Sequence, residues 1–468
     1  MKKLALFLLC LLPSLLSAQS THPAQVKPLI ITHVTVIDAT GAAAKPDMTV
    51  VIAGERITEL GKAGKVRLPK DAQVIDATGK FLIPGLWDMH AHWQRKDRLP
   101  LYLANGVTGL RIMFGFPVHH EARREIESGA LLGPRMVIAS PLVDGPNPIH
   151  RDSIAVSNAA EGRQAFIKAR QDGADFIKVY SLLPRDGYFA IADEARKQNI
   201  PFAGHVPRSV TAAEASDAGQ KSIEHLSGVA FACSKLEAEL PGDLSKLRAD
   251  VAAGANYLML LWRLEGKHLA AYDEQKAARL FARFKKNDTW QVPTLGVLQD
   301  PVRRNDPDFS DPRLKYLPPE ARGDPKKSRV FQNFTAADYD NLKKNLAKEL
   351  QIVGAMQRAG LKLMAGTDLA LLGFSLHDEL ALLVRGGLTP MEALQAAIRN
   401  PAKYLGLLDS LGTIERGKIA DLVLLAANPL TDISNTQKIQ AVIVGGKLIL
   451  KAEIEAMLAK VEAAANQK

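Results

Sequence analysis

Phe81-Leu82-Ile83-Pro84-Gly85-Leu86-Trp87-Asp88-Met89-His90-Ala91-His92 is an apolar run that ends in two histidines, two positions apart. In an extended strand alternate side chains point to the same face, so His90 and His92 would leave the strand together. Two neutral imidazoles held side by side supply half of a metal site. A His-x-His pair is common by chance, however, so its meaning depends on the ligands that later segments supply.

The composition is that of an ordinary globular protein. The 468 residues are 47% hydrophobic and 24% charged, and this length suggests two to three domains, or one large barrel with an accessory domain. The formal net charge is +10, but the basic residues are spread along the chain without interleaved aromatic residues, so we expect no nucleic-acid partner. Beyond the N-terminus no stretch approaches the ~20 apolar residues of a membrane helix, and we expect no stable membrane insertion.

The first twenty residues differ from the rest of the chain. Met1-Lys2-Lys3 is a short basic head, residues 4–16 are almost wholly apolar, and Ser17-Ala18-Gln19-Ser20 is small and polar. This order is typical of a secretory signal peptide in residues 1–20, so we expect an exported protein, periplasmic or secreted. Cys10 would leave with the signal, and Cys233 alone cannot form an internal disulfide.

The two ends of the chain have similar β-type sequence. Residues 21–80 contain short apolar segments and repeat the turn signal Asp-Ala-Thr-Gly at 38–41 and at 76–79. After Pro401 the chain returns to segments of the same kind. We therefore predict a small β-sandwich domain built from residues 21–80 and 402–450, followed by a C-terminal helix in residues 451–468.

Between these ends, in residues 81–401, short apolar segments alternate with amphipathic helical patterns. Eight such units predict an α/β fold, a closed (β/α)8 TIM-like barrel whose chemistry lies at the carboxyl ends of its strands. A doubly wound open sheet is the alternative, but no Gly-x-Gly-x-x-Gly fingerprint follows any strand. Residues 299–337 are rich in Pro, Asp and Lys and predict a long excursion, either a lid or substrate wall, or a linker. The predicted strands are 82–88, 106–113, 134–140, 175–180, 200–206, 221–226, 290–295 and 361–367.

Four more residues with metal-binding side chains fall at the ends of predicted strands: Lys178, His205, His225 and Asp368. Each has an ordinary explanation by itself. A lysine at a strand end can extend to solvent, a histidine can be a core residue, and an aspartate can cap the next helix. Together they occupy the edge that a barrel brings to within a few ångströms of one centre, and this coincidence favours a metal site.

The combination of motifs resembles the amidohydrolase superfamily, and within it imidazolonepropionase-like and prolidase-like enzymes. The residues that carry the resemblance are Pro84–His92, Lys178, His205, His225, Asp368, Asn400-Pro401-Ala402 and Gly412–Val423. The resemblance implies a (β/α)8 barrel with a small β-sandwich and a binuclear zinc centre with two Zn2+ per chain. His90, His92 and Asp368 would hold one metal, His205 and His225 would hold the other, and Lys178 would bridge them as a carbamate formed with CO2.

The resemblance also implies a reaction, the hydrolysis of a C–N bond in a dipeptide, an N-acyl amino acid or a related amide. Metal-activated hydroxide would attack the carbonyl, and Asp368 would carry the proton to the leaving nitrogen. Hydrolysis of a cyclic amide, lactone or ester on the same centre is the alternative within the fold. An exported binding protein that lacks catalysis is the alternative from another class. Barrels of this kind often associate, so a homo-oligomer is one assembly that we expect the protein to be able to form.

Three further residues are candidates for contact with a substrate. Tyr180 would face the same way as Lys178 and would either donate to the developing oxyanion or pack at the barrel rim. Arg111, near the end of the second strand, and Arg208, just after His205, would pair with a substrate carboxylate. The other histidines in predicted loops and helices are interpreted as non-ligands: His119, His120, His150, His268 and His377.

Overall fold

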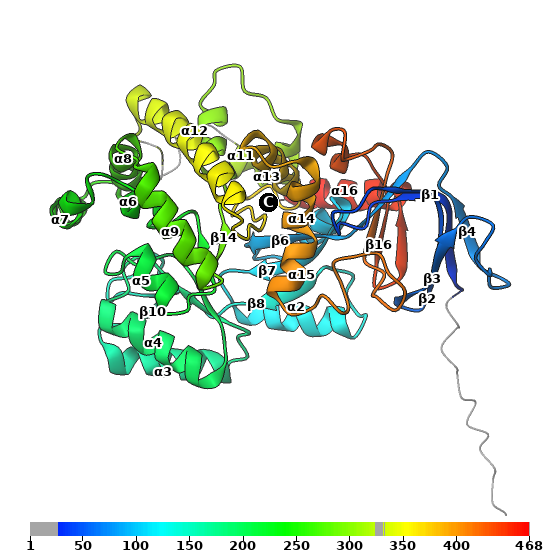
Figure 1. Cartoon of the computed structure of the whole chain (residues 1–468), viewed down its shortest axis with the longest axis horizontal. Coiled ribbons are helices and arrows are strands. Elements are labelled where there is room, and N and C mark those ends of the chain that lie inside the picture. The colour runs from blue at the N-terminus through cyan, green and yellow to red at the C-terminus, as the bar shows by residue number, and fades with distance from the viewer. Residues whose placement is uncertain (1–26, 323–330, 332, 468) are drawn as a thin grey trace, which may run out of the picture.

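The computed structural model describes residues 27–322, 331 and 333–467. The predicted signal peptide, residues 1–20, lies outside these residues. Within them, no helix is both long enough and apolar enough to cross a membrane. The described elements form a barrel and a sheet that packs beside it (Figure 1).

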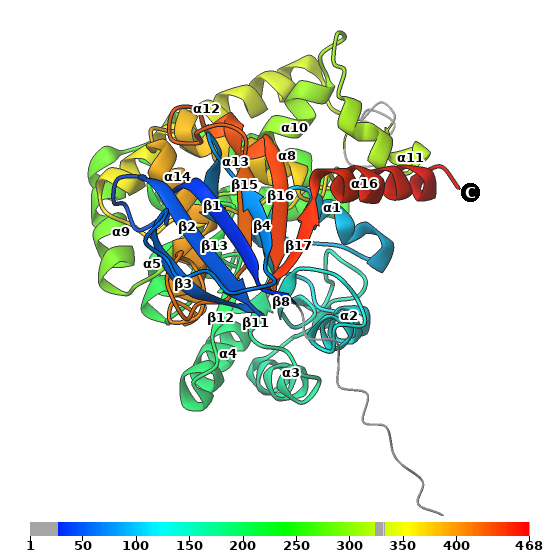
Figure 2. The ribbon, with the colours of Figure 1, turned by 90° about the vertical axis from the view of Figure 1, so that its right-hand side faces the viewer.

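Strands from both ends of the chain build the accessory domain, as the sequence predicts. They are β1 (Leu29–Val36), β2 (Lys45–Ala53), β3 (Arg56–Lys62), β4 (Gln73–Asp76), β5 (Phe81–Pro84), β15 (Leu422–Leu425), β16 (Ile439–Val444) and β17 (Lys447–Leu450). They form one eight-stranded sheet in the order β17-β16-β15-β5-β1-β2-β3, with β4 paired to β1. β5 runs parallel to β1 and antiparallel to β15, so N-terminal and C-terminal strands lie side by side (Figure 2). Their apolar side chains form a hydrophobic cluster distinct from that of the barrel.

The accessory sheet and the barrel meet at Gly85. The predicted strand 82–88 consists of two strands, β5 in the accessory sheet and β6 (Leu86–Ala91) in the barrel. The Gly85 N–H donates to the carbonyl of Asp421 at 2.8 Å, and a Cβ atom at this position would lie 2.1 Å from Oγ1 of Thr108. Glycine is therefore required by close approach, and the apolar run passes from the accessory sheet into the barrel at this residue.

Parallel strands after Gly85 build the barrel. They are β6, β7 (Val107–Ile112), β8 (Arg135–Ile138), β9 (Val143–Asp144), β10 (Ile154–Ala155), β11 (Ile177–Val179), β12 (Phe202–Gly204), β13 (Ser222–Glu224) and β14 (Trp290–Val292). Single parallel bridges join Ala139 to Phe176 and Gln291 to Leu363. The Met89 N–H donates to the carbonyl of Ala365 at 2.9 Å, so the predicted eighth strand, 361–367, closes the barrel onto β6.

Helices follow most of the barrel strands and cover them. The longer ones are amphipathic: in α9 the buried side chains Ala277, Leu280, Phe281 and Phe284 recur at helical spacing and pack toward the barrel. The predicted C-terminal helix is α16. The helices are α1 (Pro100–Ala104), α2 (Pro117–Glu127), α3 (Ala159–Gln171), α4 (Arg185–Gln198), α5 (Ala212–Asp217), α6 (Val229–Ala232), α7 (Leu240–Ala252), α8 (Tyr257–Ala270), α9 (Glu274–Lys286), α10 (Gly296–Arg304), α11 (Pro319–Arg322), α12 (Ala336–Arg358), α13 (Phe374–Arg385), α14 (Pro390–Ala397), α15 (Arg399–Tyr404) and α16 (Lys451–Ala465).

The predicted excursion at 299–337 is partly helical. It contains the end of α10, a short 3₁₀ turn at Pro312–Tyr316, and α11, while residues 323–330 and 332 lie outside the described part of the chain. Pro318, in this segment, lines a cavity of the barrel that is also lined by His90 and Asp368. This contact supports the interpretation as a substrate wall over that of a linker.

Candidate metal centre

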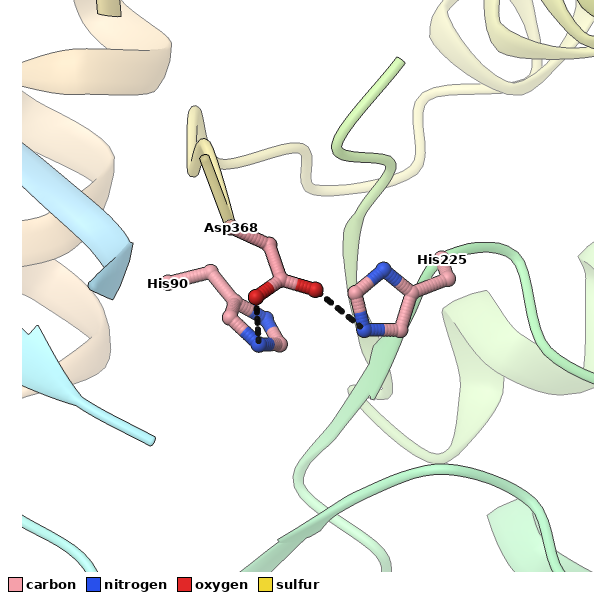
Figure 3. Close-up of side chains that lie close together, drawn as sticks. All are labelled: His90, His225 and Asp368. Carbon is pink, nitrogen blue, oxygen red and sulfur yellow. Dashed lines mark ion pairs between the residues drawn. The ribbon is translucent and has the colours of Figure 1, made fainter. Parts of the chain in front are cut away.

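Two histidines and one aspartate from separate strands meet above the barrel. The ligand atoms of His90, His225 and Asp368 all lie within 4.8 Å of one another. Figure 3 shows the Asp368 carboxylate between the two imidazoles. One carboxylate oxygen lies 3.8 Å from Nε2 of His90, and the other lies 3.6 Å from Nε2 of His225. Nε2 of His92 lies 3.1 Å from the first of these oxygens. Asp368 therefore stands at the centre of three of the predicted ligands.

The remaining predicted ligands line the same pocket. His205 packs against the ring of His225, with centroids 4.8 Å apart, and its Nδ1 lies 2.8 Å from Oγ of Ser181. Lys178 comes from the interior of β11 and is only 1% exposed. All six predicted ligand positions thus border one cavity of about 740 Å³.

Unusual backbone conformations place two of these side chains. His225 and Asp368 have φ angles of +58° and +53°, in the left-handed region that residues other than glycine rarely occupy. Such conformations cost about 1–3 kcal/mol each and persist where the surroundings fix them. Here the His225 N–H donates to the carbonyl of Val292, and the Asp368 N–H donates to the carbonyl of His90. The backbone therefore turns sharply at His225 and at Asp368, the residues that carry these two side chains.

Burial sets the charge state of the cluster. It lowers the pKa of His225 to about 4, and it lowers the pKa of His90 and of His205 well below the ordinary histidine value. Burial opposes ionisation of Asp368, but its hydrogen bond with His92 helps to hold the pKa of this carboxyl below its ordinary value. Neutral imidazoles around an anionic carboxylate are the protonation states that bind a divalent cation, so the donor set fits a metal.

Two residues outside the predicted set support the ligands. Asp88 is fully buried and accepts hydrogen bonds from the N–H of His90 and from both the N–H and the hydroxyl of Thr367. It thereby ties the first strand of the barrel to the last. Oγ1 of Thr294 lies 2.5 Å from Nδ1 of His225. Of these two residues, only Asp88 could have been found from the sequence, because it lies two positions before His90 and so on the same face of the strand.

Arg111 does not reach the pocket, which contradicts its predicted contact with a substrate. Its side chain is 0% exposed, and Nη2 donates to both carboxylate oxygens of Glu224 at 2.8 Å. Its Nε donates to the carbonyl of Met89 at 2.6 Å. The guanidinium lies inside the barrel with its charge paired, so no face of it is open to a ligand.

Arg208 and Tyr180 line the pocket beside the metal cluster. The Tyr180 ring packs against His205 in a tilted arrangement, with centroids 4.1 Å apart, and its hydroxyl oxygen lies 3.1 Å from Nε2 of His150. His150, predicted as a non-ligand, therefore borders the pocket. Among the described residues, His119, His120, His268 and His377 do not line this pocket.

A buried glutamate holds the loop that carries Thr294. Glu379 of α13 accepts hydrogen bonds from the N–H groups of Leu295 and Gly296 at 3.1 and 3.0 Å. Burial raises the pKa of Glu379 to about 8, although these two hydrogen bonds oppose the shift. The folded protein therefore keeps a proton on Glu379 in a pH range where the unfolded chain, with a carboxyl of ordinary pKa 4.5, has lost it.

This difference makes folding stability depend on pH. The contribution of Glu379 is fully present below about pH 4.5 and is lost as the pH rises toward 8. Between pH 5.5 and 8.5 the free energy of unfolding of the wild type should fall by about 2–4 kcal/mol more than that of Glu379→Gln, which carries no titratable group. Urea unfolding of the metal-free proteins at both pH values measures this. Equal losses in the two proteins would contradict the assignment.

Comparison with known proteins agrees with this architecture. The model of the amidohydrolase family matches residues 81–449. The ochratoxinase of Aspergillus niger is 34% identical over 132 residues, a match that covers 25% of this chain and 27% of that protein, so this curated relative is matched over about a quarter of its length.

Solved structures match over nearly the whole chain. A bottromycin amidohydrolase superposes with a TM-score of 0.72 at 22% identity, covering 93% of this chain and 90% of its own. A Xaa-Pro dipeptidase with bound methionine superposes with a TM-score of 0.65 at 21% identity, covering 91% and 100%. These structures share the fold. The cluster of His90, His225 and Asp368 fits the divalent metal centre that this family implies. Because the family model matches residues 81–449, which include the barrel and the last strands of the accessory sheet, the chain belongs to the amidohydrolase family.

Proposed function

We propose that the protein is a metal-dependent hydrolase that cleaves the amide or peptide C–N bond of a small substrate, such as a dipeptide or an N-acyl amino acid. The observation that carries the proposal is the convergence of six candidate ligands on one cavity with Asp368 at its centre. A cavity of about 740 Å³ is large enough for a molecule of this size. The names of the structural neighbours, a dipeptidase and an amidohydrolase, point to the same bond type.

We propose two zinc ions as the metals. His90, His92 and Asp368 would hold one, His205 and His225 would hold the other, and a carbamate on Lys178 would bridge them. Burial lowers the pKa of Lys178 to about 8, which favours the neutral amine that reacts with CO2. That reaction forms an N–C bond and releases one proton, and the resulting anionic oxygens offset the charge of two cations.

The residues of the chain have separate tasks in this reaction. Divalent cations held by these residues would lower the pKa of a bound water and polarise the substrate carbonyl. Asp368 accepts a proton from the attacking water at a carboxylate oxygen and delivers it to the leaving nitrogen. Burial raises the pKa of the Tyr180 hydroxyl, which therefore stays protonated and can donate to the oxygen of the carbonyl under attack.

Arg208 is the candidate anchor for a substrate carboxylate. It lines the pocket, and among the described residues its buried Nε has no hydrogen-bond acceptor. Arg208→Met should raise KM about 10- to 100-fold for a dipeptide with a free carboxylate, because a charge-assisted contact of about 1.5–3 kcal/mol is lost. The same dipeptide as its C-terminal amide is the matched control. An equal rise in KM for both would exclude a carboxylate contact.

The proposed function is tested with purified protein, its metal content and a substrate panel. We expect about two zinc ions per chain, hydrolysis of dipeptides or N-acyl amino acids, and loss of activity with a chelator that zinc reverses. A panel that also holds cyclic amides, lactones and esters separates the alternative substrates. Well under one zinc per chain, with no activation by added zinc, would favour a binding protein.

We also propose that the protein is exported, on the basis of the signal-like residues 1–20. Fractionation of cells that express the full chain should recover the protein outside the cytoplasm. Recovery in the cytoplasm alone would contradict export.

A further inference from the structure

An ion pair lies inside the barrel directly beneath the metal cluster. Glu224 and Arg111 are both 0% exposed, and Nη2 of Arg111 donates to both oxygens of the carboxylate at 2.8 Å. Glu224 also accepts a hydrogen bond from the Ser222 hydroxyl at 2.6 Å. Charges buried this deeply need partners, and this carboxylate has them on both oxygens.

The same carboxylate reaches a metal ligand. Oε2 of Glu224 lies 2.9 Å from Nδ1 of His90, whose side chain is 1% exposed. A carboxylate oxygen paired with an arginine can only accept, so Nδ1 of His90 carries the hydrogen. In a neutral imidazole the lone pair then belongs to Nε2, the atom that lies 3.8 Å from Asp368. The contact selects the tautomer in which His90 can bind a metal at the cluster.

The chain places Glu224 and a ligand next to each other in sequence. Glu224 ends β13 and contacts Arg111 and His90, while His225, with its left-handed φ of +58°, contacts Asp368 and Thr294. Glu224 thus contacts the candidate ligand His90, while the next residue, His225, is itself a candidate ligand. Arg111 is itself fixed by Met89, Ser222 and Tyr404, so the support for Glu224 extends through β6, β13 and α15.

We infer that Glu224 is a positioning residue of the metal centre: it keeps the hydrogen of His90 on Nδ1 and directs Nε2 toward the metal, while Arg111 compensates the buried negative charge. The inference rests on the metal centre of the proposed function. A carboxylate behind a metal-binding histidine orients the ring and raises its basicity, and loss of such a partner typically weakens metal binding 10- to 100-fold.

The test is the zinc affinity of Glu224→Gln, measured by competition with a chromophoric chelator. We expect the site that contains His90 to bind zinc about 10- to 100-fold more weakly, and the site that contains His205 to change less than threefold. Tyr404→Phe is the matched control, because it removes one hydrogen bond from Arg111 at the same depth and leaves the contact between Glu224 and His90 intact. It should bind zinc within threefold of the wild type at both sites.

Two results would overturn the inference. The first is wild-type zinc affinity in Glu224→Gln. The second is equal weakening of both zinc sites in Glu224→Gln and in Tyr404→Phe, because that pattern would indicate a general structural role. If Glu224→Gln does not fold, the double variant Arg111→Met/Glu224→Gln removes both buried charges and should fold, since an uncharged replacement of a buried pair is often tolerated. It should show the same selective loss at one site, and wild-type affinity there would also overturn the inference. A wild type that binds no zinc refutes the metal centre itself, whereas normal wild-type binding with an unaffected Glu224→Gln refutes only this inference.

Discussion

Replacement of Asp368 by asparagine should lower the turnover of an amide substrate by about 10²–10⁴-fold, while the protein stays folded. The carboxylate has a defined position, with its oxygens 3.1 Å from His92 and 3.6 Å from His225. Asparagine has nearly the same shape but cannot take up a proton and pass it on. An amide needs that proton, because an amide anion is a poor leaving group.

The control for Asp368→Asn is an ester with a good leaving group. Such a substrate does not require protonation of its leaving atom, so its turnover should fall much less than that of the amide. Both substrates are measured with excess zinc, and the bound zinc is determined, because Asp368 is also a candidate ligand. A near-normal kcat for the amide, or equal losses for both substrates in a fully loaded protein, would contradict the proton transfer.

Lys178→Ala should reduce bound zinc from two ions per chain to one or fewer and lower turnover by about 10³-fold or more. The variant lacks the ligand proposed to bridge the metals, and stabilisation by a metal pair is worth several kcal/mol. Acetate or propionate should restore part of the activity, because a small carboxylate can enter the space left by the side chain and supply the missing oxygens. Zinc analysis and steady-state kinetics with and without these acids measure both effects.

Lys221→Met is the matched control for this lysine. Lys221 is half-buried and donates to the carbonyl of Tyr404, outside the pocket lining. Its replacement should leave zinc content unchanged. Full activity of Lys178→Ala in the absence of added acids would exclude a bridging role, and a loss in Lys221→Met as large as that in Lys178→Ala would point to a general effect of removing a buried cation.

The sequence is sufficient for the parts of the site that depend on strand ends. All six candidate ligands, His225 among them, could be placed together because parallel strands of a barrel bring their carboxyl ends to one centre. The fold follows from the same alternation of segments. These inferences need only the order of the elements and the type of side chain at each end.

The parts that depend on contacts across the barrel could not be predicted in this way. Arg111 and Glu224 are 113 positions apart, and a single sequence does not show that they pair. A charge inside each of two apolar strands, one positive and one negative, is a signal for such a pair, and it also warns against a substrate role. An apolar run also does not show which sheet it enters, so the division of residues 81–91 between β5 and β6 could not be predicted.

The pairing of β5 with β15 has a consequence for the synthesis of the chain. When the ribosome has made the barrel, Leu422–Leu425 has not yet emerged, so one edge of Phe81–Pro84 has no strand beside it. An apolar strand with an open edge can pair with another chain. A product that stops before residue 420 would keep that edge exposed permanently. The last fifty residues, remote from the chemistry, thus decide whether the finished chain is protected from self-association.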